Sequence, residues 1–215
     1  MDIIFGRHGN TFGPNDKVVW VGRETDLPLV DAGWQQARAF GSALLRIGMV
    51  PDRVFCASLQ RTRGFADAMG EVQMRWRKPT VDSRLDEINY GAWAGMSTAE
   101  IEATPGGANA IELWTKHDVF PSDAGWVSTE AEIFGNINAF IDDVIKNADP
   151  REKVLVVSSN GILRFFPRLL GSRNGDLPSY VMKTGHIGMV SGEPGNFRVR
   201  FWNISAEALS RDYLA

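Results

Sequence analysis

Residues 154–157, Val-Leu-Val-Val, with Ser158-Ser159-Asn160-Gly161 directly after them, decide the fold class. A short apolar run that is rich in β-branched side chains is typical of a central parallel strand buried on both faces. Residues 162–170 are predicted to form the helix that follows. The stretch therefore predicts a protein of the α/β class, in which the rest of the chain supplies the neighbouring strands.

Patterns of strands and helices alternate in the rest of the chain. Each predicted strand is a short apolar run, and each predicted helix repeats its apolar residues at intervals of three and four. This alternation predicts a three-layer α/β/α sandwich around a mostly parallel sheet. The predicted strands are 2–6, 54–57, 187–190 and 197–202, the last two joined by a turn at 191–196, and the predicted helices are one with Asp31 as its N-cap, 59–69 and 133–145.

The length of 215 residues fits a single domain, residues 1–215, with a cap or insert around 96–130. Residues 77–128 are irregular and rich in Gly, Trp and Pro, with short helices predicted at 98–103 and 111–117. Residues 9–30 are predicted to be a long loop, and loops of that length inside a compact domain are usually functional. The seven tryptophans are compatible with an exposed aromatic contact patch and with a homodimer.

Charge and composition exclude several classes of function. The net charge is −3, so broad binding to nucleic acid is not expected. The first apolar stretch, Ile3–Phe5, is too short for a signal sequence or a membrane span, and Cys56 is the single cysteine. We therefore expect a cytoplasmic protein without a membrane partner. The three histidines have no clustered carboxylates beside them, so neither a metal site nor a cofactor is expected.

Basic side chains follow the predicted strands, where active sites of such sheets lie. Arg7 and His8 come directly after the first strand, and Arg61 comes shortly after the second. Guanidinium groups bind phosphate oxygens through paired hydrogen bonds, and helix N-termini add partial positive charge. The three side chains together therefore predict a site for a dianionic ligand such as a phosphate ion or a small phosphate monoester.

Five blocks of sequence, in the correct order, resemble the histidine phosphatase superfamily, the phosphoglycerate-mutase-like family. Arg-His-Gly-Asn-Thr directly after the first strand matches the RHGxT signature of that family. The ordered set is far more specific than RHG alone. The blocks are 7–11 (RHGNT), 21–37 (a G…D.PL…G..QA run), 58–62 (SLQRT), 85–95 (LDEINYGAWAG) and 154–164 (VLVVSSNGILR).

The resemblance implies a metal-independent mechanism. His8 would attack phosphorus and form a phosphohistidine that water hydrolyses, while Arg7 and Arg61 would hold the phosphoryl oxygens. Glu87 would be the general acid that protonates the leaving oxygen and later activates water. Asn15 lies near the place where family members have a phosphate-contacting Asn, offset by one residue.

Ser159 is the main departure from the family pattern, because it replaces the second catalytic histidine. Its hydroxyl can contact phosphate, but it carries no charge and has a shorter reach. Loss of one such donor costs roughly 10²–10³ in rate. His186 precedes a strand that ends near the same edge, so it could enter the site and partly replace the missing donor. A serine-hydrolase role for Ser159 is disfavoured, since Val157 stands where the nucleophile elbow requires a small residue.

Several functions remain open from the sequence. The chain is an impaired or specialised phosphatase, a pseudophosphatase that binds phosphorylated ligands, or a protein in which a ligand-trapping substitution was introduced at Ser159. A phosphoglycerate-mutase-type phosphotransferase is disfavoured, because residues 96–150 lack the paired arginines and the Pro run of the mutases. Aromatic residues of the same segment could line a lid over an apolar leaving group or form the core of the cap; they are Trp114, Phe120, Trp126 and Phe134.

Overall fold

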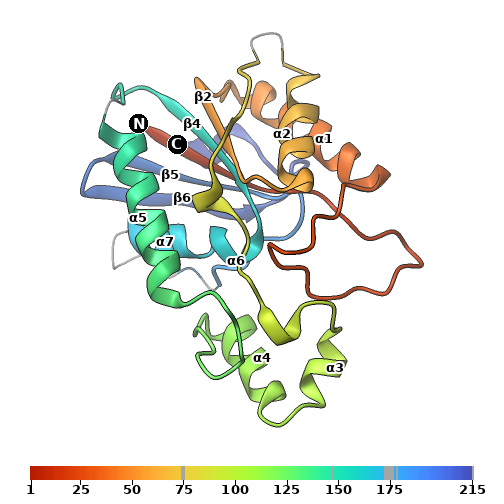
Figure 1. The fold of residues 1–215 in the computed structure, drawn as a ribbon. Coiled ribbons are helices and arrows are strands. Elements are labelled where there is room, and N and C mark those ends of the chain that lie inside the picture. The colour runs from red at the N-terminus through yellow and green to blue at the C-terminus, as the bar shows by residue number, and fades with distance from the viewer. Residues whose placement is uncertain (74–75, 147, 172–176, 178, 215) are drawn as a thin grey trace.

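A six-stranded sheet forms the centre of the computed structural model, which describes residues 1–73, 76–146, 148–171, 177 and 179–214 (Figure 1). The strand order is β3-β2-β4-β1-β5-β6; β3, β2, β4 and β1 are parallel, β5 is antiparallel to β1, and β6 is antiparallel to β5. The mostly parallel sheet predicted from the sequence is thus confirmed. The strands are β1 (Asp2–Arg7), β2 (Arg53–Cys56), β3 (Thr80–Val81), β4 (Lys153–Ser158), β5 (Ile187–Glu193) and β6 (Asn196–Ile204).

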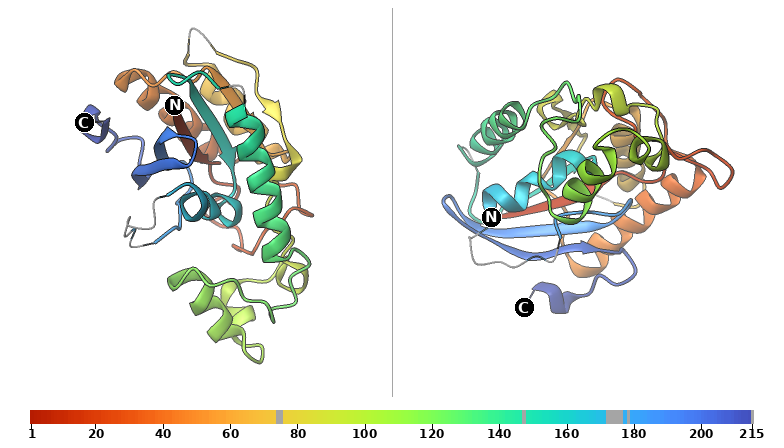
Figure 2. Two further views of the ribbon diagram at one scale, coloured as in Figure 1. Left: turned by 90° about the vertical axis from the view of Figure 1, so that its left-hand side faces the viewer. Right: turned by 90° about the horizontal axis from the view of Figure 1, so that it is seen from below.

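Helices cover both faces of the sheet, because the central strands are apolar on both sides. Side chains alternate along β4: Val154 and Val156 belong to one hydrophobic cluster, and Leu155 and Val157 belong to another. The first cluster packs against α5 (Glu130–Lys146), α6 (Asn160–Leu163) and α7 (Phe165–Leu170). The second packs against α1 (Asp31–Ile47) and α2 (Gln60–Gly70). These layers confirm the α/β/α sandwich (Figure 2).

A lower lobe lies beyond the carboxyl ends of the central strands (Figure 1). The lobe contains α3 (Thr98–Glu102) and α4 (Gly107–Lys116). Two 3-10 turns, η1 (Ser83–Leu85) and η2 (Gly91–Trp93), precede it in the chain. A third turn, η3 (Arg211–Leu214), lies near the C-terminus. Trp114 and Trp126 pack edge to face with ring centroids 5.1 Å apart. Trp114 belongs to the same hydrophobic cluster as β4, so the core of the lobe is continuous with the core of the sandwich.

Several predicted details are wrong. Asp31 is the first residue of α1 and not its N-cap, which is Val30. The helix predicted at 162–170 is divided between α6 and α7; Pro167 has no N–H to donate to the carbonyl of Leu163, which explains the interruption. The two exposed residues of β3 carried no apolar pattern and were not predicted as a strand. All seven tryptophans are buried or half-buried, so they do not form an exposed contact patch.

The ends of β1 and β4 are paired at the edge of the sheet where the sequence predicts the site. Arg7 lies opposite Ser158 in the parallel register, and the backbone N–H of His8 donates to the Ser158 carbonyl over 3.1 Å. The residues that follow both strands are therefore adjacent in space. Within the described ranges, no helix has the length and the apolar character needed to cross a bilayer.

Candidate active site

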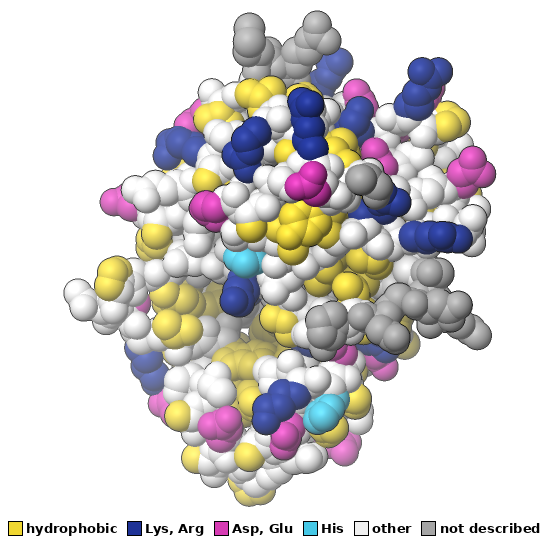
Figure 3. Space-filling view, turned by 180° about the vertical axis from the view of Figure 1, so that it is seen from behind, with side chains coloured by type: hydrophobic (Ala, Val, Ile, Leu, Met, Phe, Trp, Pro, Cys, Tyr) yellow, Lys and Arg dark blue, Asp and Glu magenta, His cyan; other side chains and the backbone are white. Residues whose placement is uncertain are grey.

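A cavity of about 560 Å³ opens at this edge, between the sandwich and the lower lobe. It is lined by the residues after β1, by parts of the 9–30 loop, and by Thr98, Trp114 and Thr115 of the lobe. In the view from behind, apolar side chains gather in a hollow between the two parts of the molecule (Figure 3). The loop is tied to the lobe, since Trp20 Nε1 donates to Thr98 Oγ1 over 3.1 Å and Lys17 pairs with Glu100 at 2.7 Å.

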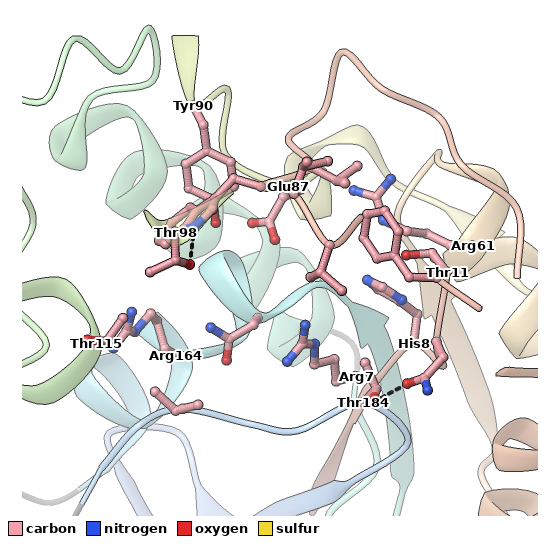
Figure 4. A pocket seen from close by; sticks show the side chains of 18 of the residues that line it. Arg7, His8, Thr11, Arg61, Glu87, Tyr90, Thr98, Thr115, Arg164 and Thr184 are labelled. Atoms are coloured by element: carbon pink, nitrogen blue, oxygen red, sulfur yellow. Dashed lines mark hydrogen bonds between the residues drawn. The ribbon is translucent and has the colours of Figure 1, made fainter. Parts of the chain in front are cut away.

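His8 lies at one end of the cavity and is 6% exposed (Figure 4). Its Nδ1 is 2.8 Å from the Gly9 carbonyl oxygen, which can only accept, so Nδ1 carries the proton. Burial, with Arg7 and Arg61 nearby, holds the pKa of the imidazole well below its ordinary value. The ring is therefore neutral, and Nε2 keeps the lone pair that a nucleophile needs.

Arg7 and Arg61 supply the positive charge at this end. Arg7 Nη1 donates to the Met182 carbonyl over 2.7 Å, while its buried Nε has no partner among the described residues. Arg61, near the start of α2, is 1% exposed and donates to the Thr25 carbonyl over 2.9 Å. Two guanidinium groups held by backbone carbonyls form a rigid site for an anion with several oxygens.

Glu87 projects into the same end of the cavity (Figure 4). Its carboxylate accepts from the Ile88 N–H over 2.9 Å and from the Gly161 N–H over 3.3 Å. Burial raises the pKa of Glu87 above its ordinary value, although these N–H groups and the two arginines oppose the shift. Gly161 permits this close approach, because a Cβ there would collide with Glu87 Oε1 and lie 2.7 Å from the Tyr90 hydroxyl. Such a carboxyl is suited to donate a proton.

The far end of the cavity contains Arg164, whose Nη2 is engaged, whereas its buried Nε and Nη1 have no partner among the described residues. The guanidinium carbon, Cζ, lies 3.7 Å from the ring centroid of Trp114, and Nη2 donates to the Trp114 carbonyl over 2.6 Å. Nη2 also pairs with the Asp118 carboxylate. Arg164 therefore joins α6 and α7 to the end of α4, and its charge is neutralised by Asp118.

The structure brings four of the residues expected from the sequence into one cavity: Arg7, His8, Arg61 and Glu87. Three others do not line it. Asn15 is exposed in the 9–30 loop. Ser159 is 1% exposed, and its Oγ has no partner among the described residues. His186 donates from Nδ1 to the Asn203 carbonyl over 2.9 Å, and its own carbonyl accepts from the Arg7 N–H.

Sequence reasoning assigned no role to several residues of the cavity wall. Asn10, Tyr90, Asn160 and Thr184 all line it. Of the four aromatic residues proposed for a lid, Trp114 lines the cavity, whereas Phe120 and Trp126 pack edge to face with ring centroids 5.1 Å apart and Phe134 packs on Phe165. In the described part of the chain, no group of three or more His, Cys, Asp or Glu residues could hold a metal ion.

Comparisons with known proteins identify the family to which the chain is similar. The sequence model of the histidine phosphatase superfamily, branch 1, matches residues 3–205. A 2,3-bisphosphoglycerate-dependent phosphoglycerate mutase of Rhizobium etli is 26% identical over 164 residues, covering 75% of this chain and 76% of the mutase. A glucosyl-3-phosphoglycerate phosphatase of Mycolicibacterium vanbaalenii is 25% identical over 231 residues, covering 95% of each chain.

Solved structures share the fold over nearly the whole chain. Mycobacterial glucosyl-3-phosphoglycerate phosphatase, in complex with inorganic phosphate, superposes with a TM-score of 0.74 at 23% identity, over 96% of this chain and 98% of that one. A putative α-ribazole-5′-P phosphatase of Escherichia coli has a TM-score of 0.72 at 19% identity, over 98% and 97% of the two chains.

Proposed function

This chain belongs to the histidine phosphatase superfamily, and on that premise we propose that it hydrolyses a phosphate monoester, without a metal ion, through a phosphohistidine on His8. The observation that carries the proposal is the hydrogen bond that fixes the tautomer of His8. Its Nδ1–H is held by the Gly9 carbonyl at 2.8 Å, so the free lone pair is on Nε2, beside the buried guanidinium groups of Arg7 and Arg61. Phosphate binding by a structural relative supports the same choice of ligand.

In the first step, His8 Nε2 forms a bond to phosphorus while the bond between phosphorus and the ester oxygen breaks. Glu87 gives its proton to the departing oxygen, so that the leaving group departs as a neutral alcohol. Arg7 and Arg61 stabilise the charge on the oxygens that stay with phosphorus. The products of this step are the alcohol, a phosphohistidine and the Glu87 carboxylate.

In the second step, water attacks the phosphohistidine. The Glu87 carboxylate takes a proton from the water as the new bond to phosphorus forms and the bond to Nε2 breaks. Inorganic phosphate leaves, His8 is again neutral, and Glu87 is again protonated. Both steps use the same four side chains, and neither requires a cofactor.

Hydrolysis is favoured over a mutase reaction by the charges in the cavity. A phosphoglycerate carries a carboxylate in addition to its phosphate, so a mutase site needs further cations. Apart from Arg7 and Arg61, the described lining offers Arg164, which Asp118 already neutralises. Much of the remaining wall is apolar, with Val19, Trp20 and Trp114 among its residues.

The Ser159 position favours a second candidate, a pseudophosphatase that binds phosphorylated ligands without turnover. Ser159 Oγ is buried and does not line the cavity, so it is poorly placed to hold the phosphoryl group. We propose that the chain turns over, with a rate limited by the weak hold on the phosphoryl group at this position. Asn15 and His186 have no part in this mechanism.

Introducing a histidine at position 159 should increase turnover. We expect Ser159→His to raise kcat for an activated aryl phosphate by about 10²-fold, because a protonated imidazole adds a charge-assisted donor. Steady-state hydrolysis by both proteins, with EDTA present, measures the effect and tests for dependence on metal. Equal rates would show that another group already supplies the hydrogen bond to the phosphoryl group that a histidine at position 159 would donate. No turnover by either protein, with phosphate still protecting the fold against heat, would support the pseudophosphatase.

A further inference from the structure

Asn160 borders the same cavity as Arg7 and His8, and the mechanism above does not use it. We propose that Asn160 Nδ2 donates a hydrogen bond to a nonbridging oxygen of the phosphoryl group and thereby stabilises the transition state. This inference rests on the proposed function of the same site. It identifies a catalytic residue in addition to Arg7, His8, Arg61 and Glu87.

The sheet register places Asn160 close to the nucleophile. Arg7 lies opposite Ser158, the last residue of β4, and Asn160 follows two residues later as the first residue of α6. The His8 N–H donates to the Ser158 carbonyl over 3.1 Å, which holds the two chain segments side by side. Asn160 therefore lies at the neighbouring strand end, close to the ligand that Arg7 and His8 would hold.

The orientation of the Asn160 amide is determined by the backbone of Met182. The Met182 N–H donates to Asn160 Oδ1 over 2.8 Å, and an N–H cannot accept, so this atom must be the oxygen. Nδ2 is then the other amide atom, and no described residue accepts a hydrogen bond from it. The Met182 carbonyl accepts from Arg7 Nη1 over 2.7 Å. One residue thus orients both Arg7 and Asn160, which makes Nδ2 a preorganised donor.

The neighbouring polar side chains are less suited to this role. Ser159 Oγ is buried outside the cavity lining. The Thr184 hydroxyl donates to Asn10 Oδ1 over 2.6 Å, so its single proton is engaged. The His186 ring is held by the Asn203 carbonyl. Asn160 lines the cavity, and its amide is oriented by the Met182 N–H, while the Met182 carbonyl holds Arg7.

Two variants of Asn160 separate the donor from the acceptor. Asn160→Asp keeps an oxygen for the Met182 N–H but has no amide donor, and it adds a negative charge. Asn160→Leu has a similar size and neither group, but it adds no charge. Asn138→Asp, on the exposed side of α5, makes the same chemical change away from the cavity. The measurements are kcat and KM for an activated aryl phosphate, the Kd of orthovanadate, and the melting temperature.

We expect both Asn160 variants to lose about 10²-fold in kcat, the usual cost of removing one transition-state donor. Orthovanadate affinity should fall by a similar factor, because a five-coordinate vanadate adduct resembles the transition state, whereas KM should change much less in Asn160→Leu, which adds no charge. Asn138→Asp should leave all four quantities unchanged. The vanadate measurement requires no turnover, so it tests Asn160 even if the chain binds phosphate without hydrolysing it.

Two results would overturn the inference. If both Asn160 variants keep the original kcat and vanadate affinity, Nδ2 does not touch the phosphoryl group. If Asn160→Leu is impaired and Asn160→Asp is not, Asn160 acts by holding Met182, and it is a positioning residue. Failure of the proposed function is a separate outcome, since it appears as activity that survives the loss of His8.

Discussion

His8→Ala is expected to lower kcat/KM for phosphate monoesters by roughly 10⁴-fold or more, because a methyl group has no lone pair with which to attack phosphorus. Arg7 and Arg61 are unchanged in this variant, so phosphate should still bind and raise the melting temperature. The measurement is steady-state hydrolysis of an aryl phosphate, together with the thermal shift that phosphate produces.

His117→Ala is the matched control for His8→Ala. His117 is exposed at the end of α4 and does not line the cavity, so its removal should leave hydrolysis unchanged. The same change at two histidines of one chain separates the loss of a nucleophile from any general effect of truncation. Comparable activity in His8→Ala and in the original chain would show that the nucleophile lies elsewhere.

Glu87→Gln should slow hydrolysis most when the leaving group is a poor one. The amide keeps the size of the carboxyl but has no proton to give, so hydrolysis of an alkyl phosphate should fall by about 10²-fold or more. An activated aryl phosphate departs without protonation, so the first step with it should slow much less. Pre-steady-state release of the alcohol or phenol measures that step for both substrates.

The pH profile provides a second signature of Glu87. Burial raises the pKa of Glu87, so the protonated acid persists above the ordinary carboxyl range and is lost as the pH rises through that raised pKa. Burial lowers the pKa of His8, so the neutral nucleophile persists into acid. For an alkyl phosphate, kcat/KM should therefore fall on the alkaline side, and Glu87→Gln should remove that fall.

The exposed carboxylate of Glu102 on α3 serves as the control for Glu87, and Glu102→Gln should change neither the rates nor the pH profile. Equal losses by Glu87→Gln on good and poor leaving groups would contradict the general-acid role. In that case, Glu87 would act mainly through the hydrogen bonds that its carboxylate accepts from Ile88 and Gly161.

The sheet and the edge that carries the candidate site were predictable, because their signals are local. An apolar run such as 154–157 is sufficient to indicate a buried strand, and parallel strands bring their carboxyl ends to one edge. Arg7 is the last residue of β1, His8 follows it directly, and Arg61 comes shortly after the end of β2. Glu87 follows no long strand, and it was identified through the ordered motifs that resemble the family.

Other parts of the site depend on contacts that no local pattern reveals. The orientation of Asn160 depends on a hydrogen bond from Met182, which is 22 residues away in the chain. Arg164 is held by Trp114 and Asp118, which are 50 and 46 residues away. His186 precedes a strand as predicted, but its ring is bound by the Asn203 carbonyl of β6. The orientations of these three side chains are therefore determined by tertiary contacts.

The most direct test of the account is to trap the phosphorylated enzyme. The protein is mixed with an activated aryl phosphate, quenched in alkali during turnover, digested, and mapped by mass spectrometry for the residue that carries the phosphoryl group. The account predicts a phosphorylated His8, absent in His8→Ala and present in His117→Ala. Turnover with no phosphorylated residue, or with the phosphoryl group on another side chain, would contradict it.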